Sequence, residues 1–406
     1  MQKRILFLGA SHSQLAPIKY AKEEGHYVIT CDYLPENPGH KLADEYHNIS
    51  TTDKEAVLEL AKRLSIDGIV AYASDPAAPT QAYVANHLGL FSNPYSSVLI
   101  LSRKDLFRNF LREHNFYVPK SKVFYGYTEA KEWLDSVALP VIVKPVDSSG
   151  SKGVTQVKAE EELKSAFEYA LNYSKEKKVI VEEFFARSGY QIGGDSFLVD
   201  GKLVFASYTN THFDKNCNPL VPVGGSLPSV YQKPFLDKVH DELQRLLTLL
   251  EMNQGAINHE FQFDQNNNIL VIEAGARNGG NLIPELVYHA TGVDMVKYTV
   301  DAALGKDVSS LKMKEPEGFY AYYVLHALQD GTVEDIWFSD EIRKNIIQES
   351  IYIKKGDKVR QFKGSDRTLG IFIMKFFSEQ EMIEKMDQMN EHIEVKIKEV
   401  DNSDLS

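Results

Sequence analysis

The chain has 406 residues, a formal net charge of -12, 43% hydrophobic and 25% charged residues, and two cysteines. This length exceeds what one hydrophobic core fills, so we expect two or three domains, and the composition excludes a disordered or fibrous protein. The acidic balance excludes a nucleic-acid surface, because phosphate contacts need clustered Lys and Arg, although one pocket can still bind nucleotide phosphates.

Strand-like and helical segments alternate in the first third of the chain. Apolar runs at 4–10 and 26–32 flank a helical stretch at 14–24, and strand patterns at 45–49 and 68–72 surround an amphipathic stretch at 54–64. This order predicts a doubly wound parallel sheet. A helix at 97–114 follows, and Pro119 interrupts the helical pattern.

The rest of the chain mixes strands and helices. Strands are expected at 140–145, 179–185, 195–209, 257–263 and 269–274, with helices at 160–173 and 234–251. From about Pro316, strand-rich segments at 320–328, 350–356 and 368–376 precede one helix and a last strand near 392–398. We therefore expect an α/β and α+β protein with domains at 1–115, 116–305 and 306–406.

The apolar run at the N-terminus is too short for a signal peptide, and no stretch approaches bilayer length. We therefore expect a cytoplasmic protein with no membrane partner. Cys31 and Cys217 are far apart and lack metal-ligand spacing, which fits a reducing compartment and offers no zinc site.

The first strand-to-helix turn begins at Gly9, and Asp32 stands where a dinucleotide-binding domain places its ribose ligand. Ser11 and Gln14 occupy the second and third glycine positions, where side chains would obstruct the pyrophosphate. The turn therefore disfavours NAD and favours a small-ligand contact from Ser11, Ser13 or Gln14.

A loop of small polar residues follows the strand at 140–145. Gly150 and Gly153 allow successive backbone amides to point at phosphate oxygens. Hydroxyl groups and positive charges come from Ser148, Ser149, Ser151, Lys144 and Lys152. The loop is a candidate phosphate cover, and a solvated surface turn is the alternative.

Two carboxylates lie on strands that a turn at 264–268 joins into a hairpin. If the turn is centred on 266–267, Glu260 faces Glu273, while Phe261 and Phe263 face Ile272 and Leu270 on the apolar side. Like charges directly opposite destabilise a sheet unless a cation lies between them. Magnesium suits two carboxylates together with substrate phosphates, so the pair predicts a metal site, with a solvent-facing pair as the alternative.

Arg277 follows the second carboxylate by four residues, close to the predicted metal. Its planar guanidinium suits a carboxylate or a transferring phosphoryl group, because it binds two oxygens at once. The alternative is a surface arginine.

Taken in order, Lys104 and the segments at 142–154, 181–185 and 257–280 resemble the ATP-grasp superfamily, in the branch of carbamoyl-phosphate synthetase, biotin carboxylase and amino-acid ligases. The resemblance covers about residues 1–305. It implies a pre-ATP-grasp domain, a central ATP-grasp domain and a small closing domain.

The resemblance also implies roles for individual residues. Arg277 and Lys144 would be catalytic, with Arg277 steadying an acyl phosphate. ATP would contact Lys104, Lys144, Glu182, Glu183, Phe185 and Gln191, under a mobile loop that contains Ser149, Gly150, Ser151 and Gly153. Mg²⁺, or Mn²⁺ as the alternative, would bind Glu260 and Glu273.

Two positions depart from the family pattern. Gly275 stands where many relatives place an asparagine that completes the metal site, so Asn278 or Asn281 would substitute. Gln191 stands near the position of an acidic ribose ligand.

The expected activity is ATP-dependent activation of a small carboxylate as an acyl phosphate, followed by ligation to an amine or another nucleophile. The loop at 212–229, with His212, is a candidate acceptor lid. Two alternatives remain: a purine-pathway ligase that joins phosphoribosylamine to glycine, and a non-catalytic ATP-binding regulatory protein. The carboxylate, the nucleophile and a homodimeric assembly stay open.

Overall fold

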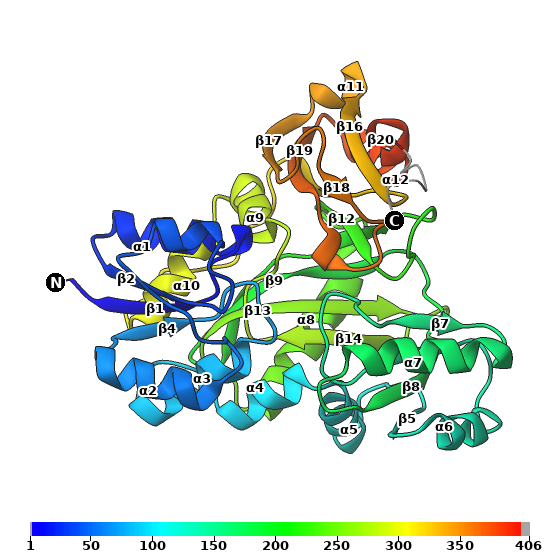
Figure 1. Ribbon diagram of the computed structural model, residues 1–406, viewed down its shortest axis with the longest axis horizontal. Coiled ribbons are helices and arrows are strands. Elements are labelled where there is room, and N and C mark those ends of the chain that lie inside the picture. The colour runs from blue at the N-terminus through cyan, green and yellow to red at the C-terminus, as the bar shows by residue number, and fades with distance from the viewer. Residues whose placement is uncertain (1, 399–406) are drawn as a thin grey trace, which may run out of the picture.

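The computed structural model describes residues 2–398, and Figure 1 shows their arrangement. A parallel N-terminal sheet has the order β3-β2-β1-β4. Its strands are β1 (Arg4–Leu8), β2 (Tyr27–Cys31), β3 (Glu45–His47) and β4 (Gly68–Val70).

Helices cover both faces of this sheet, so the predicted doubly wound architecture is confirmed. Alternate side chains of β1 enter different cores: Ile5 and Phe7 pack toward α1 (Leu15–Glu23) and α10 (Met295–Ala303), whereas Leu6 and Leu8 pack toward α2 (Lys54–Leu64) and α3 (Ala78–Leu88). Figure 1 shows the two helix layers on opposite sides of the strands. Helix α3 was not predicted.

The helix expected at 97–114 is two helices, α4 (Tyr95–Ser102) and α5 (Lys104–Glu113). Arg103 between them is extended, with φ -118° and ψ 113°, which breaks the helical ladder. The break places Lys104 in the first turn of a new helix.

A second sheet has the order β5-β8-β6-β7 and is antiparallel throughout. Its strands are β5 (Ser121–Phe124), β6 (Val141–Pro145), β7 (Thr155–Val157) and β8 (Val179–Glu183), and it packs with α6 (Tyr127–Leu134) and α7 (Leu163–Tyr173) around one apolar core.

A large antiparallel sheet runs β14-β13-β9-β11-β12-β15-β19-β17, with β10 paired to β9. Its strands are β9 (Gln191–Val199), β10 (Lys202–Ala206), β11 (Thr209–Phe213), β12 (Pro222–Leu227), β13 (Gly255–Phe263), β14 (Ile269–Gly275), β15 (Phe319–Leu325), β17 (Ile346–Ile351) and β19 (Gly370–Phe376). The sheet therefore joins the middle of the chain to its C-terminal strands.

Two strand expectations need correction here. The segment expected as a lid loop at 212–229 contains β12, which pairs with β11 and β15 in the sheet interior. The strand expected at 350–356 is β17, which ends at Ile351 because its pairing with β19 ends at Gly370.

The remaining elements complete the C-terminal half. A small sheet, β18-β16-β20, consists of β16 (Gly331–Phe338), β18 (Lys358–Val359) and β20 (Ile393–Lys398). The helices are α8 (Lys233–Leu249), α9 (Ile283–Thr291), α11 (Asp340–Arg343) and α12 (Glu379–Asp387). Short 3-10 turns occur at His12–Gln14, Pro38–Lys41, Glu160–Glu162, Ser365–Arg367 and Met389–Glu391.

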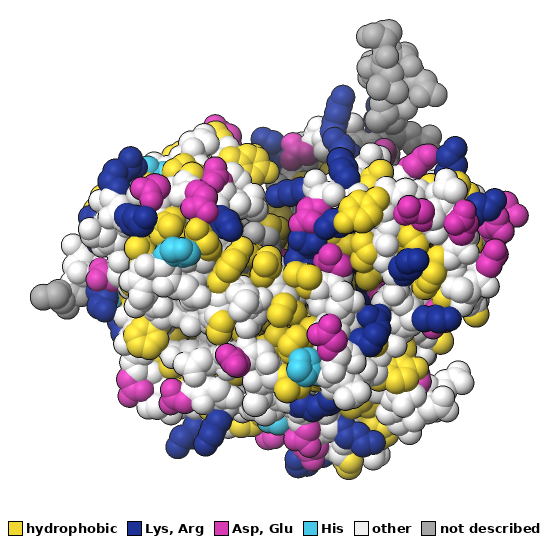
Figure 2. Space-filling model, turned by 90° about the horizontal axis from the view of Figure 1, so that it is seen from below, with side chains coloured by type: hydrophobic (Ala, Val, Ile, Leu, Met, Phe, Trp, Pro, Cys, Tyr) yellow, Lys and Arg dark blue, Asp and Glu magenta, His cyan; other side chains and the backbone are white. Residues whose placement is uncertain are grey.

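Within residues 2–398, no helix is both long and apolar enough to cross a bilayer. Figure 2 shows one face of the molecule, on which basic side chains are interspersed with acidic and apolar ones.

Candidate active site

A cavity lies between the second sheet and the large sheet. Its lining includes most of the predicted nucleotide and metal residues: Lys104, Lys144, Gly150, Ser151, Glu182, Glu183, Phe185, Gln191, Glu260 and Glu273. They come from α5, β6, β8, β9, β13, β14 and the loop after β6. Apolar side chains such as Ile142, Leu270 and Ile272 complete the walls, so the cavity combines an apolar slot with a charged end.

The predicted carboxylate pair is present, because Glu260 on β13 pairs directly with Glu273 on β14. The predicted pairing of the phenylalanines is wrong. A bulge between Glu260 and Phe261 shifts the register by one residue, so Phe261 pairs with Val271. Gln191 on β9 donates a hydrogen bond of 3.0 Å to Glu260, which places Gln191 beside the carboxylates.

Burial raises the pKa of Glu260, and the opposite Glu273 raises it further, to about 7. A cation must therefore displace a proton from Glu260 below neutral pH. We expect Mg²⁺ to bind about tenfold more weakly at pH 6 than at pH 8. Calorimetric titration of Mg²⁺ into the ATP-saturated protein at several pH values measures this, and an affinity independent of pH would contradict it.

Three charged side chains that line the same cavity form a buried network. Both oxygens of Glu182 are engaged, one by Lys144 and one by Arg108 at 3.1 Å. Arg108 also donates to two carbonyl groups of β14. Burial alone would raise the pKa of Glu182, but Arg108 and Lys144 lower it to about 2. Glu182 is therefore a fixed anion that positions Lys144, and both of its carboxylate oxygens are occupied within the protein.

The loop after β6 follows the edge of the cavity. Gly150, Ser151 and Gly153 have left-handed φ angles of 64°, 57° and 76°. The Lys104 ammonium group donates a hydrogen bond to the Ser148 carbonyl, and Ser151 Oγ donates one of 3.1 Å to the Leu220 carbonyl. Ser149 and Gly153 lie in this loop but do not line the cavity.

We expect the loop at 147–153 to exchange amide hydrogens more slowly when nucleotide is bound. Its residues are small, so they supply few apolar contacts that would hold it without a ligand. Hydrogen exchange with and without Mg-ATP measures this protection. Unchanged exchange at saturating nucleotide would indicate a static surface turn.

Arg277 is held by an acidic residue from the N-terminal sheet. Asp75 lies beyond the carboxyl end of β4, and its two oxygens accept hydrogen bonds of 2.6 and 2.7 Å from Arg277. A Cβ built on Gly275 would lie 2.9 Å from Asp75 Oδ1 and 3.3 Å from Arg277 Nε. The pair thus fills the space that a side chain at position 275 would need.

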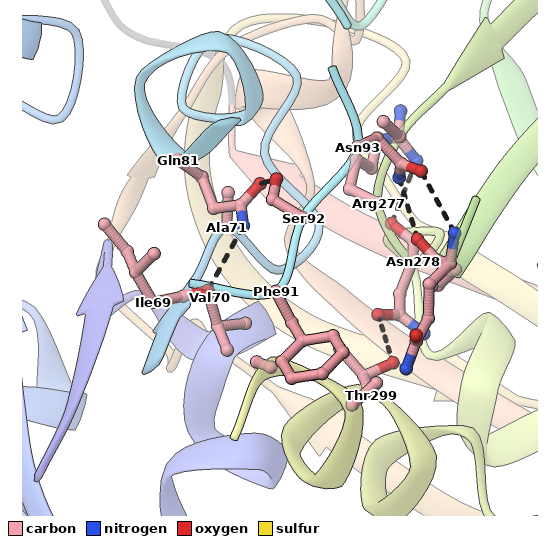
Figure 3. Close-up of a pocket in the computed structure, with 16 residues that line it drawn as sticks. Ile69, Val70, Ala71, Gln81, Phe91, Ser92, Asn93, Arg277, Asn278 and Thr299 are labelled. Atoms are coloured by element: carbon pink, nitrogen blue, oxygen red, sulfur yellow. Dashed lines mark hydrogen bonds between the residues drawn. The ribbon is translucent and has the colours of Figure 1, made fainter. Parts of the chain in front are cut away.

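Asn278 does not line the cavity that holds the carboxylates. It is fully buried, and Oδ1 accepts a 2.9 Å hydrogen bond from Thr299. Figure 3 shows both residues in a separate pocket near Asn93 and Phe91, and Asn278 Nδ2 has no partner there among the described residues. Asn278 is therefore not placed to complete a metal site with Glu260 and Glu273.

Two other side chains that were candidates for ligand contacts form hydrogen bonds within the protein. Gln14 accepts from the backbone amide of Ser11 at 2.8 Å and donates to the Tyr72 carbonyl at 2.7 Å. His212 contacts Asp387 and Ser226 through its two nitrogens, each at 2.9 Å. Both side chains connect elements of the fold, so neither is free for a ligand in this conformation.

A family model for the ATP-grasp domain matches residues 137–285, which contain the loop, the carboxylate hairpin, and Lys144 and Glu182 of the buried network. Over 344 residues, the chain is 25% identical to the C-terminal section of the carbamoyl phosphate synthase large chain from Aquifex aeolicus, covering 79% of this chain and 60% of that one. The chain spans about half the length of several other curated relatives.

Residues 137–285 therefore form an ATP-grasp domain.

Solved structures support the ATP-grasp architecture across nearly the whole chain. Phosphoribosylglycinamide synthetase from Anaerococcus prevotii has a TM-score of 0.74 and 25% identity, covering 98% of this chain and all of that one. L-amino acid ligase from Bacillus licheniformis has a TM-score of 0.79 and 18% identity, covering 98% and 99%. The second likeness concerns the fold alone.

Two residues of the candidate site were missed in the sequence, although each carried a signal. Arg108 lies four residues after Lys104, so both occupy one face of a helix. Asp75 follows a parallel strand at its carboxyl end, where ligands of open α/β sheets bind. Arg108 is buried and Asp75 is half-buried, and each holds another site residue in place.

Proposed function

We propose that this ATP-grasp protein is an ADP-forming ligase that activates a small carboxylic acid with ATP and joins it to an amine. The observation that carries the proposal is the pair of facing carboxylates, Glu260 and Glu273, at the charged end of a cavity that also contains Lys104 and Lys144. This arrangement suits the triphosphate of a nucleotide, with its base in the apolar slot.

The residues present fit Mg²⁺. Glu260 and Glu273 face each other, the raised pKa of Glu260 shows that its negative charge lacks a compensating cation, and together the two residues offer the hard oxygen ligands that this ion prefers. When bound there, Mg²⁺ would neutralise phosphate charge during transfer. Gln191 would orient Glu260, and Lys144, fixed by Glu182, would hold phosphate oxygens.

In the first step, a substrate carboxylate oxygen attacks the γ-phosphorus, the bond to the β-γ bridging oxygen breaks, and ADP leaves. Lys104 and Lys144 stabilise the charge on the phosphate oxygens, and positioning supplies most of the rate. Arg277, held by Asp75, would bind the carboxylate and then the acyl phosphate. In the second step, the amine nitrogen attacks the acyl carbon, phosphate leaves, and the nitrogen loses a proton.

A matrix of carboxylic acids and amines, including all pairs of amino acids, tests the proposal by phosphate release. Release that requires both an acid and an amine is expected for at least one pair. The Glu273→Gln protein in parallel reports contaminating activity. ATP hydrolysis without product in every pair would contradict a ligase.

A purine-pathway ligase is the second candidate, because phosphoribosylglycinamide synthetase from Anaerococcus prevotii is similar over its whole length. Phosphoribosylamine with glycine therefore belongs in the matrix. Turnover with this pair alone would favour this candidate over an amino-acid ligase.

We expect thermal stabilisation by Mg-ATP and none by NAD. The cavity holds phosphate and metal ligands, whereas the side chain of Gln14 fills the turn that a dinucleotide would approach. Melting curves with each ligand measure this difference. Stabilisation by NAD but not by Mg-ATP would contradict both the ligase and the regulatory ATP-binding protein.

We also propose that the chain divides into domains at 1–115, 116–305 and 306–406. The protein would be cytoplasmic and its partners would be small-molecule substrates. Stabilisation by Mg-ATP without turnover in any pair would favour the non-catalytic alternative. A homodimer is tested by light scattering of the purified chain.

A further inference from the structure

A second cluster of metal-ligand side chains lies outside the proposed nucleotide site. Asp214 follows β11, Cys217 lies three residues later, and His326 follows β15. One ligand atom from each side chain lies within 4.8 Å of the other two. Asp214 and His326 are buried, and Cys217 is half-buried.

The hydrogen bonds of His326 determine which nitrogen faces the cluster. Nδ1 lies 2.8 Å from the Val324 carbonyl, which can only accept, so Nδ1 carries a proton. Nε2 lies 3.0 Å from Asp214 Oδ2. A neutral imidazole would thus direct its lone pair at a carboxylate oxygen, which requires either a second proton or a cation between the two atoms.

The surroundings of Asp214 leave one oxygen facing the cluster. Oδ1 accepts from the Asn216 amide at 2.7 Å and from Asn390 Nδ2 at 3.1 Å. Oδ2 is directed at His326. A histidine whose second nitrogen bonds a carbonyl, beside a carboxylate oriented by its own hydrogen bonds, is the usual outer arrangement of a metal site.

We propose that Asp214, Cys217 and His326 bind one thiophilic divalent cation, of which Zn²⁺ is the prime example. Ligands of such an ion lie about 2.0 to 2.3 Å from it, so their atoms are roughly 3.3 to 3.8 Å apart. Asp214 Oδ2 and His326 Nε2, now 3.0 Å apart, would separate slightly around the ion, and Cys217 Sγ, within 4.8 Å of both, would move toward it. On binding, the thiol gives up its proton.

The spacing of cysteines in the sequence offered no such site, because His326 is over a hundred residues from Cys217. The fold brings them together through β12, which pairs with β11 on one side and β15 on the other. A cavity beside Asp214 and His326 has room for water at a fourth position.

The cation would hold the segment at 214–221, which also reaches the proposed nucleotide site. Leu220 in this segment lines that cavity and accepts the hydrogen bond from Ser151. The site would therefore fix one wall of the nucleotide cavity against the C-terminal strands.

Co²⁺ titration of the full chain under reducing conditions, with excess Mg²⁺ occupying the hard carboxylate site, tests the proposal. The expected result is a near-ultraviolet band from thiolate-to-cobalt charge transfer, which saturates at one ion per chain. Cys217→Ser should remove the band, and His326→Gln should weaken Co²⁺ binding about tenfold or more. Zn²⁺ should displace Co²⁺ and bleach the band.

Cys31→Ala is the matched control, because Cys31 is the other cysteine and lies in the core of the N-terminal sheet. This variant should keep the band. Absence of a thiolate band in the unmodified chain, or its persistence in Cys217→Ser, would overturn the proposal and leave an ion pair between Asp214 and a protonated His326. Neither outcome depends on nucleotide turnover, so this test and that of the ligase fail separately.

Discussion

Glu273→Gln is expected to abolish ATP-dependent phosphate release while the protein stays folded. Glu273 faces Glu260 across the hairpin at the charged end of the cavity, so the variant loses one of two proposed Mg²⁺ ligands. The amide is nearly the same size as the carboxylate and opens no space in the core. We expect turnover to fall below detection, since phosphoryl transfer depends on charge neutralisation by the metal.

Stability should change in the opposite direction from activity. Like charges opposite each other in a sheet cost on the order of 0.2 to 1 kcal/mol. Above the pKa of Glu260, about 7, the ionised Glu260 faces Glu273, so the metal-free variant should melt slightly higher than the unmodified protein. Below that pH Glu260 is protonated, and the difference should shrink.

Phosphate-release assays and melting curves at pH 6 and pH 8, with and without Mg²⁺, measure both effects. Glu129→Gln is a control for the change of carboxylate to amide, because Glu129 is exposed on α6 and does not line the cavity. Wild-type turnover in Glu273→Gln, or an unfolded metal-free variant, would show that the pair is structural.

The sequence predicted features that depend on local spacing. Glu260 and Glu273 could be placed opposite each other because a five-residue turn limits the register of a hairpin. The bulge after Glu260 could not be foreseen, because it inserts a residue without altering the alternation of apolar side chains in the rest of β13. The parallel sheet at the N-terminus likewise followed from its alternating strands and helices.

Contacts between distant segments were beyond what the sequence could predict. Asp75 and Arg277 are 202 positions apart, and Asp214 and His326 are 112 apart, so no local periodicity connects them. Asn278 was expected at the metal because it is near Glu273 in the sequence, but the chain turns after β14 and buries it against Thr299. The sequence motif therefore indicated which residue types occur near the carboxylates, but it did not indicate where the Asn278 side chain points.

Asp75→Asn is expected to lower kcat/KM by about 100-fold, since two charge-assisted hydrogen bonds to Arg277 become weak or are lost. Asp75 acts as a positioning residue that holds the guanidinium toward the carboxylate substrate. The KM for that carboxylate should rise, whereas the Kd for ATP should hardly change. A purely structural role would instead affect both substrates and the melting temperature alike.

Gly275 provides an independent test of the same pair. Its φ is not left-handed, so the backbone accepts alanine, but the new methyl group would lie 2.9 Å from Asp75 Oδ1. Gly275→Ala should therefore displace Asp75 and lower kcat/KM. In an Asp75→Ala background the nearer obstacle is gone and only the 3.3 Å approach to Arg277 Nε remains, so the same substitution should cost less, giving a coupling energy of about 1 to 3 kcal/mol.

Gly280→Ala is the control for this cycle, because a Cβ there would meet no atom within 4 Å and the φ angle is also ordinary. It should leave kcat/KM unchanged in both backgrounds. Additive effects of Asp75→Ala and Gly275→Ala would show that the two residues act independently. Since the methyl group at 275 would lie closer to Asp75 Oδ1, at 2.9 Å, than to Arg277 Nε, at 3.3 Å, a strong coupling would show that the acidic residue from the N-terminal sheet occupies the space of a side chain at position 275.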